Sequence, residues 1–111
     1  MMKEISFNTN EIDWEVAKEY PAGAMKKVLL ESSESVLQSF LLKIEPGWKM
    51  EEHSHVYTEL HYVLEGEVWS GDKVFPAGSF RIIPKQTNHG PFTTNKSAVI
   101  LVVWIRESSP L

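Results

Sequence analysis

The sequence predicts an all-β protein, folded either as a sandwich or as a barrel. Hydrophobic residues recur with a period of two along most of the chain, which is the spacing that buries one face of a strand. Turn-forming glycine and proline residues return roughly every 8–12 residues, as in proteins built from short antiparallel strands. Only residues 10–20 could form a helix, and Pro21-Ala22-Gly23 would end it.

The length and composition indicate one ordered domain. A chain of 111 residues can bury one real core but is too short for two. Its composition, 42% hydrophobic and 23% charged, is that of a globular protein and not of a disordered one. No repeat or linker divides it. We therefore expect a single domain over residues 1–111, with a barrel core at 24–105 and residues 1–23 packing outside the barrel.

The first half of the expected barrel contains two main strands. Residues 25–31 are predicted to form the first one. In the second, residues 38–44, the side chains of Phe40, Leu42 and Ile44 alternate with their neighbours along the strand. Because successive side chains of a strand point to opposite faces, these three are predicted to fill the barrel interior.

The second half supplies the remaining strands. Residues 60–69 are rich in β-branched and aromatic side chains and end at Ser70-Gly71-Asp72, which predicts a hairpin turn. A short strand is expected at 80–83, before Pro84. Residues 98–105 are apolar at successive positions, so both faces of this strand are predicted to be buried. One face would point into the barrel, and the other would meet a second layer, the N-terminal segment or another subunit.

The charge pattern argues against nucleic acid and membranes as partners. The net charge is −4 and the eleven basic residues are scattered, whereas phosphate binding needs a clustered basic face. Lys26-Lys27 is the only adjacent basic pair, which is too little to hold an anionic membrane surface. The longest apolar run, 98–105, is far shorter than a membrane span. The first residues lack the apolar stretch of a secretory signal, so a cytoplasmic location is expected.

Four residues form a candidate metal site. His53 and His55 are two positions apart, and Glu59 follows four residues later. On a strand, residues two apart share a face about 7 Å apart, and a turn would also allow all three to converge. His89 follows a short strand and a proline-bearing turn, from which it could return to the barrel mouth. The alternative is a solvated polar strand with an unrelated histidine, but three of the four histidines in the chain belong to this set.

The chemistry of these side chains limits which metal ions could bind. The chain contains no cysteine, so disulfides and thiolate ligands are excluded and any metal must use nitrogen and oxygen ligands. Imidazole and carboxylate together suit iron, manganese, nickel, copper or zinc.

The spacing around these residues resembles the two cupin motifs. Gly47-x5-His53-x-His55-x3-Glu59-x6-Gly66 is similar to the first motif at every position. Gly78-x5-Pro84-x4-His89 is similar to the second, with Gln86 in place of a usual glycine and Thr93 in place of a usual asparagine. The resemblance covers roughly residues 20–105. It implies a double-stranded β-helix, or jelly-roll barrel, of six or more strands.

The resemblance also implies how the site is used. His53, His55, Glu59 and His89 would bind one divalent metal ion, Fe, Mn, Ni or Zn, and an octahedral ion would keep two positions open for water, dioxygen or substrate. Two groups are most similar to the segments around Trp14, 76–81 and 89–92. One is the zinc-binding cupin domain of bacterial anti-sigma factors, and the other is the iron-dependent diketone-cleaving dioxygenases.

Three functions remain open at this point. The first, slightly favoured, is a dioxygenase-like enzyme acting on a small organic molecule. The second is a non-catalytic zinc-binding sensor or small-ligand module, and the third is a metal-dependent isomerase or epimerase. Each would bind a small molecule, and a fold of this kind cannot choose between them. A homodimer is expected, because the doubly apolar last strand and the open sheet edges would otherwise be exposed.

Other side chains are open to two interpretations. His61 should point into the barrel near the metal, as a proton shuttle, a partner of the ligands or an alternative ligand, or else as a hydrogen-bonded core histidine. Arg81 is expected in a surface ion pair, with the anchoring of a substrate carboxylate as the alternative. Trp48, Trp69 and Trp104 are expected in the core or an interface, with a pocket lining as the alternative.

Overall fold

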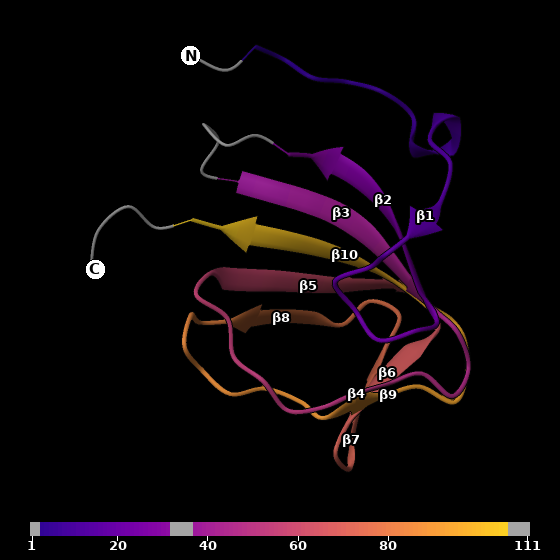
Figure 1. Cartoon of the computed structure of the whole chain (residues 1–111), viewed down its shortest axis with the longest axis vertical. Coiled ribbons are helices and arrows are strands. Elements are labelled where there is room, and N and C mark those ends of the chain that lie inside the picture. The colour runs from indigo at the N-terminus through magenta and orange to yellow at the C-terminus, as the bar shows by residue number, and fades with distance from the viewer. Residues whose placement is uncertain (1–2, 32–36, 107–111) are drawn as a thin grey trace.

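The computed structural model describes residues 3–31 and 37–106, which form two antiparallel sheets facing each other. The large sheet has the strand order β1-β2-β3-β10-β5-β8, and the small sheet has the order β4-β9-β6-β7 (Figure 1). The all-β prediction is confirmed, and the two sheets make a jelly-roll barrel. The strands are β1 (Glu15–Val16), β2 (Ala24–Leu30), β3 (Leu37–Ile44), β4 (Lys49–Met50), β5 (Thr58–Glu65), β6 (Glu67–Ser70), β7 (Lys73–Pro76), β8 (Phe80–Ile83), β9 (Phe92–Thr93) and β10 (Ala98–Ile105).

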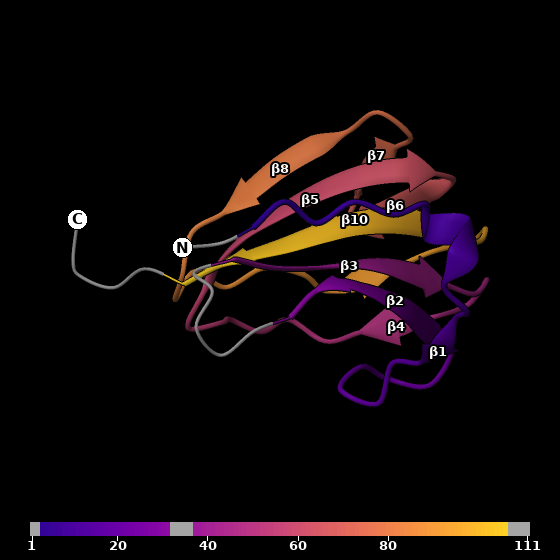
Figure 2. The same ribbon diagram turned by 90° about the horizontal axis from the view of Figure 1, so that it is seen from above.

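The large sheet is a curved wall, seen from above in Figure 2 as β8, β5, β10, β3 and β2 side by side. Its centre is the pairing of β3 with β10, which runs without a register shift from Ala98 opposite Ile44 to Ile105 opposite Leu37. Alternation along these strands sends every second side chain into the barrel. The prediction for β3 is confirmed, since Phe40, Leu42 and Ile44 are all buried.

The core fills the space between the two sheets. Side chains of the large sheet meet Val68 on β6 and Phe92 on β9, which come from the small sheet. The outer side of β10 is less buried than its unbroken run of apolar residues predicted. Val99, Leu101 and Val103 are only half-buried in a single copy of the chain.

One predicted strand is in fact two. Residues 60–69 were expected to be continuous, but β5 ends before Gly66 and β6 begins after it. Gly66 has φ +75°, and a Cβ at this position would overlap the carbonyl oxygen of Ser97. The chain therefore leaves the large sheet at Gly66 and enters the small one. The hairpin predicted after it is present, since Ser70 pairs with Lys73 across Gly71-Asp72.

The N-terminal segment lies partly outside and partly inside the barrel. Residues 10–20 form no α-helix, because β1 and the 3-10 helix η1 (Thr9–Glu11) occupy this region. Outside, the Lys27 ammonium donates to the Thr9 carbonyl at 2.9 Å and lies 4.9 Å from the Trp14 ring centroid.

The end of this segment packs against the barrel core, whereas the sequence predicted that all of residues 1–23 would lie outside the barrel. Ala17 belongs to the hydrophobic core, and Tyr20 packs against that core. The indole nitrogen of Trp48 donates to the Pro21 carbonyl at 3.1 Å. The pairing of β1 with β2 continues in the hydrogen bond from the Ala17 amide to the Ala24 carbonyl, which holds Ala17 against the core. Within residues 3–31 and 37–106, no helix is long and apolar enough to cross a membrane.

Candidate metal centre

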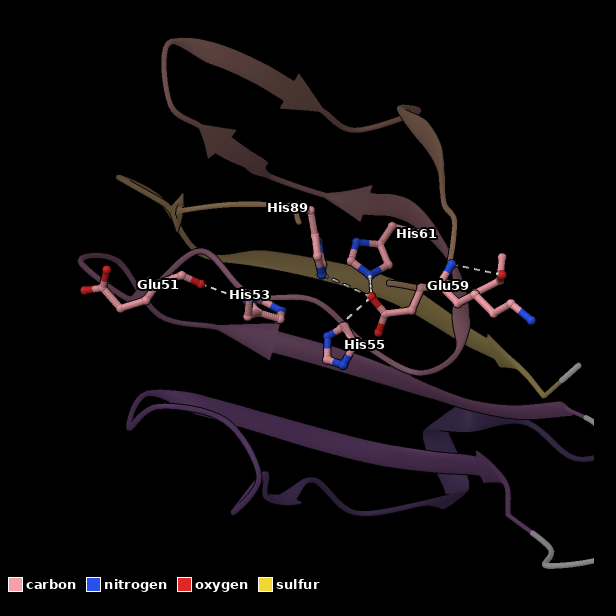
Figure 3. A network of polar contacts seen from close by, with 8 residues as sticks. Glu51, His53, His55, Glu59, His61 and His89 are labelled. Atoms are coloured by element: carbon pink, nitrogen blue, oxygen red, sulfur yellow. Dashed lines mark hydrogen bonds and ion pairs between the residues drawn. The ribbon is translucent and has the colours of Figure 1, made fainter. Parts of the chain in front are cut away.

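Three separate segments bring the predicted ligands together (Figure 3). His53 and His55 lie in the loop between β4 and β5, Glu59 lies on β5, and His89 lies in the loop between β8 and β9. The histidine pair is thus not on one unbroken strand with Glu59. A bend at residues 56–57 separates them and turns all the side chains toward one point.

Backbone hydrogen bonds fix the two loops to each other. His53 and His89 form an isolated β-bridge, in which the His53 amide donates to the His89 carbonyl at 3.0 Å and the His89 amide donates back at 2.8 Å. The Gln86 amide donates to the His55 carbonyl at 2.6 Å. Hydrogen bonds between backbone atoms therefore hold these distant residues together. Their side chains are not used for this purpose and remain available to bind a metal ion.

The donor atoms lie close enough to share one ion. His53, His55 and His89 each offer a ring nitrogen, and these three atoms lie within 4.8 Å of one another. The Glu59 Oε2 atom is 3.6 Å from Nε2 of His55 and 3.6 Å from Nε2 of His89. Donors about 2.1 Å from a metal are about 3 Å apart when adjacent and about 4.2 Å apart when opposite. The three ring nitrogens thus form a group that could hold one ion, and the Glu59 carboxylate lies beside two of them.

The residues fit a bound cation on independent grounds. Glu59 is 1% exposed, and its Oε2 atom and Nε2 of His89 are buried without a hydrogen-bond partner in the described part of the chain. A buried, unpaired carboxylate is costly unless a cation is bound to it. His53 Nδ1 donates to the Glu51 carbonyl at 2.7 Å. This hydrogen bond leaves the lone pair on Nε2, as in histidines that bind metals.

The surroundings also favour the protonation states that bind metal. The pKa of His89 is lowered to about 4, chiefly by burial and by the nearby His53, against the opposing charge of Glu59. Burial likewise lowers the pKa of His55. Burial alone would raise the pKa of the Glu59 carboxyl, but the neighbouring imidazoles, above all His61, outweigh it and hold that pKa below its usual value. At neutral pH these shifts leave His55 and His89 neutral and Glu59 ionised, which are the forms that bind a metal.

His61 lies beside these four residues. Its Nε2 atom is 3.5 Å from Glu59 Oε2, and its ring centroid is 6.2 Å from that of His89. Like the ligands, it faces the barrel interior, because it follows Glu59 by two residues on β5.

A largely apolar pocket opens onto the donor atoms. Its cavity volume is about 30 Å³, and the space between atoms reaches about 510 Å³ when the open mouth is included. Tyr20 is among the lining residues that the sequence did not predict, because nothing in the local pattern distinguishes this side chain from an exposed one. Burial raises the pKa of the Tyr20 hydroxyl, which therefore stays protonated. Besides Tyr20, the lining consists of Leu42, Trp48, Met50, His53, His55, Glu59, His61, Val63, Val68, Phe75, Arg81, His89, Phe92 and Ile100.

Of the three tryptophans, Trp48 and Trp104 take the core position expected for them, and Trp69 is half-buried and lines no part of the pocket. Trp48 is buried in the core and also lines the pocket. Trp104 packs on the core, edge-on to Phe40, with ring centroids 5.5 Å apart. Its ring also stacks with Tyr57 at 5.6 Å and lies 6.0 Å from His55. Trp104 therefore supports the histidine loop from the side.

Comparisons with solved structures show the same fold in proteins of low sequence identity. An RmlC-like cupin protein from Ralstonia eutropha is 21% identical, with a TM-score of 0.81 over 95% of this chain and 70% of that chain. The polyketide cyclase RemF from Streptomyces resistomycificus is 22% identical, with a TM-score of 0.76 over 99% and 83%. An acetylacetone dioxygenase from Acinetobacter johnsonii is 12% identical, with a TM-score of 0.73 over 95% and 74%.

Sequence comparisons identify the family. A search of curated proteins found no match. The family model described as the ChrR cupin-like domain matches residues 2–107. Because this match spans nearly the whole chain and the barrel agrees with it, the chain belongs to the ChrR cupin-like family of cupins.

Proposed function

We propose that this protein is a metal-dependent enzyme with dioxygenase-type chemistry on a small, largely apolar organic molecule. The observation that carries the proposal is the position of the four ligands His53, His55, Glu59 and His89. They lie on the wall of an apolar pocket, not in an enclosed structural site. A small molecule entering the pocket would meet a metal ion held there, as catalysis requires.

The donor set suits Fe, Mn, Ni or Zn, and for oxygen chemistry we propose iron. When bound, the ion supplies Lewis acidity toward a substrate oxygen and, as iron, reactivity toward dioxygen. The protein holds it with three imidazoles and one carboxylate. Fewer protein ligands than an octahedral ion accepts leave room for substrate.

The chain's own residues supply binding and proton transfer. The apolar pocket wall, which includes Leu42, Val63 and Ile100, would bind the hydrocarbon part of a substrate and exclude water. His61 Nε2, 3.5 Å from Glu59 Oε2, would accept or donate a proton beside the reacting atoms. Similar folds include proteins named as an acetylacetone dioxygenase and as a polyketide cyclase. The two names indicate that a barrel of this fold can convert small organic molecules, which supports the proposal.

Oxygen consumption tests the proposal. The Fe(II)-loaded protein is expected to take up dioxygen with one or more small diketones or phenolic ketones. His89→Ala should lose both metal and uptake, whereas His61→Ala should keep its metal and lose most of the uptake. No uptake across the substrate panel would contradict the dioxygenase. Turnover of a carbonyl substrate under anaerobic conditions would favour an isomerase or epimerase instead.

A second candidate function is a non-catalytic zinc-binding sensor. The family match to the ChrR cupin-like domain favours it, as does the similarity of the sequence to the cupin domain of anti-sigma factors. In that case purified protein should contain stoichiometric zinc by elemental analysis. Small ligands should then bind to the zinc-loaded protein without being converted.

A further inference from the structure

Arg81 is the one arginine or lysine side chain that lines the pocket among the described residues. It lies on β8 directly opposite His61 on β5. Alternation along β8 turns Phe80 and Ile82 to the outside, where they are 59% and 58% exposed. Arg81 therefore points to the interior side, toward the metal ligands.

Two aromatic rings hold the guanidinium in place. Its central carbon lies 4.2 Å from the Phe75 ring centroid and 5.2 Å from that of Phe92. Both rings also line the pocket. Stacking of this kind orients a guanidinium and leaves its N–H edge available for another partner.

The guanidinium has no carboxylate partner of its own. Across residues 3–31 and 37–106, Arg81 forms neither an ion pair nor a side-chain hydrogen bond, so the surface ion pair expected from the sequence is absent. Burial lowers its pKa, and the charge of Glu59 opposes that effect. An arginine nevertheless remains charged in proteins, so a cation faces an apolar pocket unpaired.

A bound metal would increase this excess of positive charge. Of the residues that the structure describes, Glu59 is the only acidic one that lines the pocket, and a divalent ion would more than neutralise it. The positive charge of Arg81 is then not neutralised by the protein and can attract an anionic group of a bound small molecule. A carboxylate matches a guanidinium with two parallel hydrogen bonds, which are stronger than bonds between neutral groups.

We propose that Arg81 anchors a carboxylate of the ligand, so that this pocket takes a small, mostly apolar monocarboxylate. The inference rests on the proposed function in placing substrate in this pocket, and it narrows the substrate class. Carboxylated ketones and phenols would then be better substrates than the uncharged diketones of similar size.

Paired acids and amides test the proposal without any turnover. Isothermal titration calorimetry would compare isobutyrate with isobutyramide and benzoate with benzamide, using metal-free and Zn(II)-loaded protein. The wild-type protein should bind each acid at least about tenfold more tightly than its amide, as expected for hydrogen bonds to a charged group. Arg81→Gln should lose this preference, and Arg81→Lys should retain part of it.

Lys73→Gln is the matched control. Lys73 is exposed, its ammonium lies 5.4 Å from the same Phe75 ring centroid, and it does not line the pocket. Removing its charge should leave the preference for acids unchanged. Equal binding of acid and amide by the wild-type protein, no binding of either, or an undiminished preference in Arg81→Gln would each overturn the proposal.

The proposal can fail independently of the enzyme function. If the protein binds no metal or consumes no oxygen, the proposed function fails, while Arg81-dependent binding of acids to the metal-free protein still decides the inference. Circular dichroism and thermal unfolding of the Arg81 variants would show whether they fold. If both variants are unfolded, the proposal is tested by two remaining comparisons. These are the binding of acid and amide by the wild-type protein and the same binding by Lys73→Gln.

Discussion

At the scale of single residues, the centre combines side chains that are poorly satisfied without a cation. Glu59 is ionised and buried, and its Oε2 atom has no hydrogen-bond donor among the described residues. The nearby imidazoles offset part of the free energy lost by burying this charge, and a bound ion would offset more. The same residue should therefore stabilise the metal-bound protein and destabilise the metal-free one.

Glu59→Gln should separate these two effects. We expect its zinc affinity to fall at least about 100-fold, because the only anionic ligand is lost. The metal-free variant should be at least as stable as the wild-type protein. Zinc at about 100 times its Kd should add about 2.7 kcal/mol to the unfolding free energy of the wild-type protein. The same zinc concentration should add little to that of the variant.

Calorimetry and thermal unfolding with and without zinc would measure both effects. Glu51→Gln is the control, since its side chain is exposed and only its main-chain carbonyl contacts His53. This change should leave zinc affinity unchanged. Wild-type affinity in Glu59→Gln would show that Glu59 is not a ligand.

A second prediction at this scale concerns Gln86, the residue that replaces the glycine usual in the second cupin motif. Its φ is +59°, a conformation that costs a residue with a Cβ about 1–2 kcal/mol. Gln86→Gly should therefore raise the unfolding free energy by about 1 kcal/mol, once the extra entropy of glycine in the unfolded chain is subtracted. Denaturant titration would measure it. Gln86→Ala, which keeps the strain, should show no gain.

At the scale of secondary structure elements, the corner between β5 and β6 decides the fold. β5 carries Glu59 and His61 in the large sheet, and β6 begins the small sheet that covers the pocket. The chain changes sheet at Gly66, where its backbone contacts Ser97 just before β10. This contact lies at the end of the pairing between β5, which carries the site residues, and β10.

Gly66→Ala should therefore be among the most destabilising single substitutions in the barrel. We expect the unfolding free energy to fall by about 3 kcal/mol or more, because the methyl group overlaps main chain and φ is unfavourable. Gly71→Ala is the matched control. Gly71 also has positive φ, but an added Cβ meets nothing within 4 Å, so this change should cost only about 1 kcal/mol. Equal losses would contradict the close approach.

At the scale of the whole molecule, the outer face of the large sheet remains apolar. Tyr62 lies between Phe80 on β8 and Leu101 on β10, and Ile82 pairs with Leu60 beside them. Tyr62 is 40% exposed, and Phe80 and Ile82 are more so. Exposed apolar residues that adjoin in this way are characteristic of interfaces. We propose that a second copy of the chain covers them, because a two-fold dimer buries the same face of both subunits.

Light scattering coupled to size-exclusion chromatography should find a dimer. Tyr62→Lys combined with Ile82→Lys should convert it to a folded monomer, since two charges would be buried at the interface. Val74→Lys is the control, because Val74 is exposed and apolar but lies on β7 in the small sheet. It should leave the dimer intact. A wild-type monomer would remove the proposal.

The local sequence pattern was enough to predict the bounds of strands that end at a proline or a polar residue. The predicted bounds 80–83 and 98–105 agree with β8 and β10, because proline or polar residues end each apolar stretch. The same reasoning joined β5 to β6, since β-branched and aromatic residues continue on both sides of Gly66. The chain turns there because the backbone of Gly66 contacts Ser97. Ser97 is distant in the sequence, so the residues around Gly66 do not reveal this contact.

For the site, the sequence by itself determined which side-chain types are available to bind a metal. The spacing of His53, His55 and Glu59 and the absence of cysteine limited a metal to nitrogen and oxygen ligands, because side-chain type sets what can coordinate. Only the tertiary structure decided which of these groups meet. The bridge between His53 and His89, the pocket wall supplied by Tyr20 and the unpaired position of Arg81 all depend on contacts between distant segments, and their geometry is set by the packing of the two sheets.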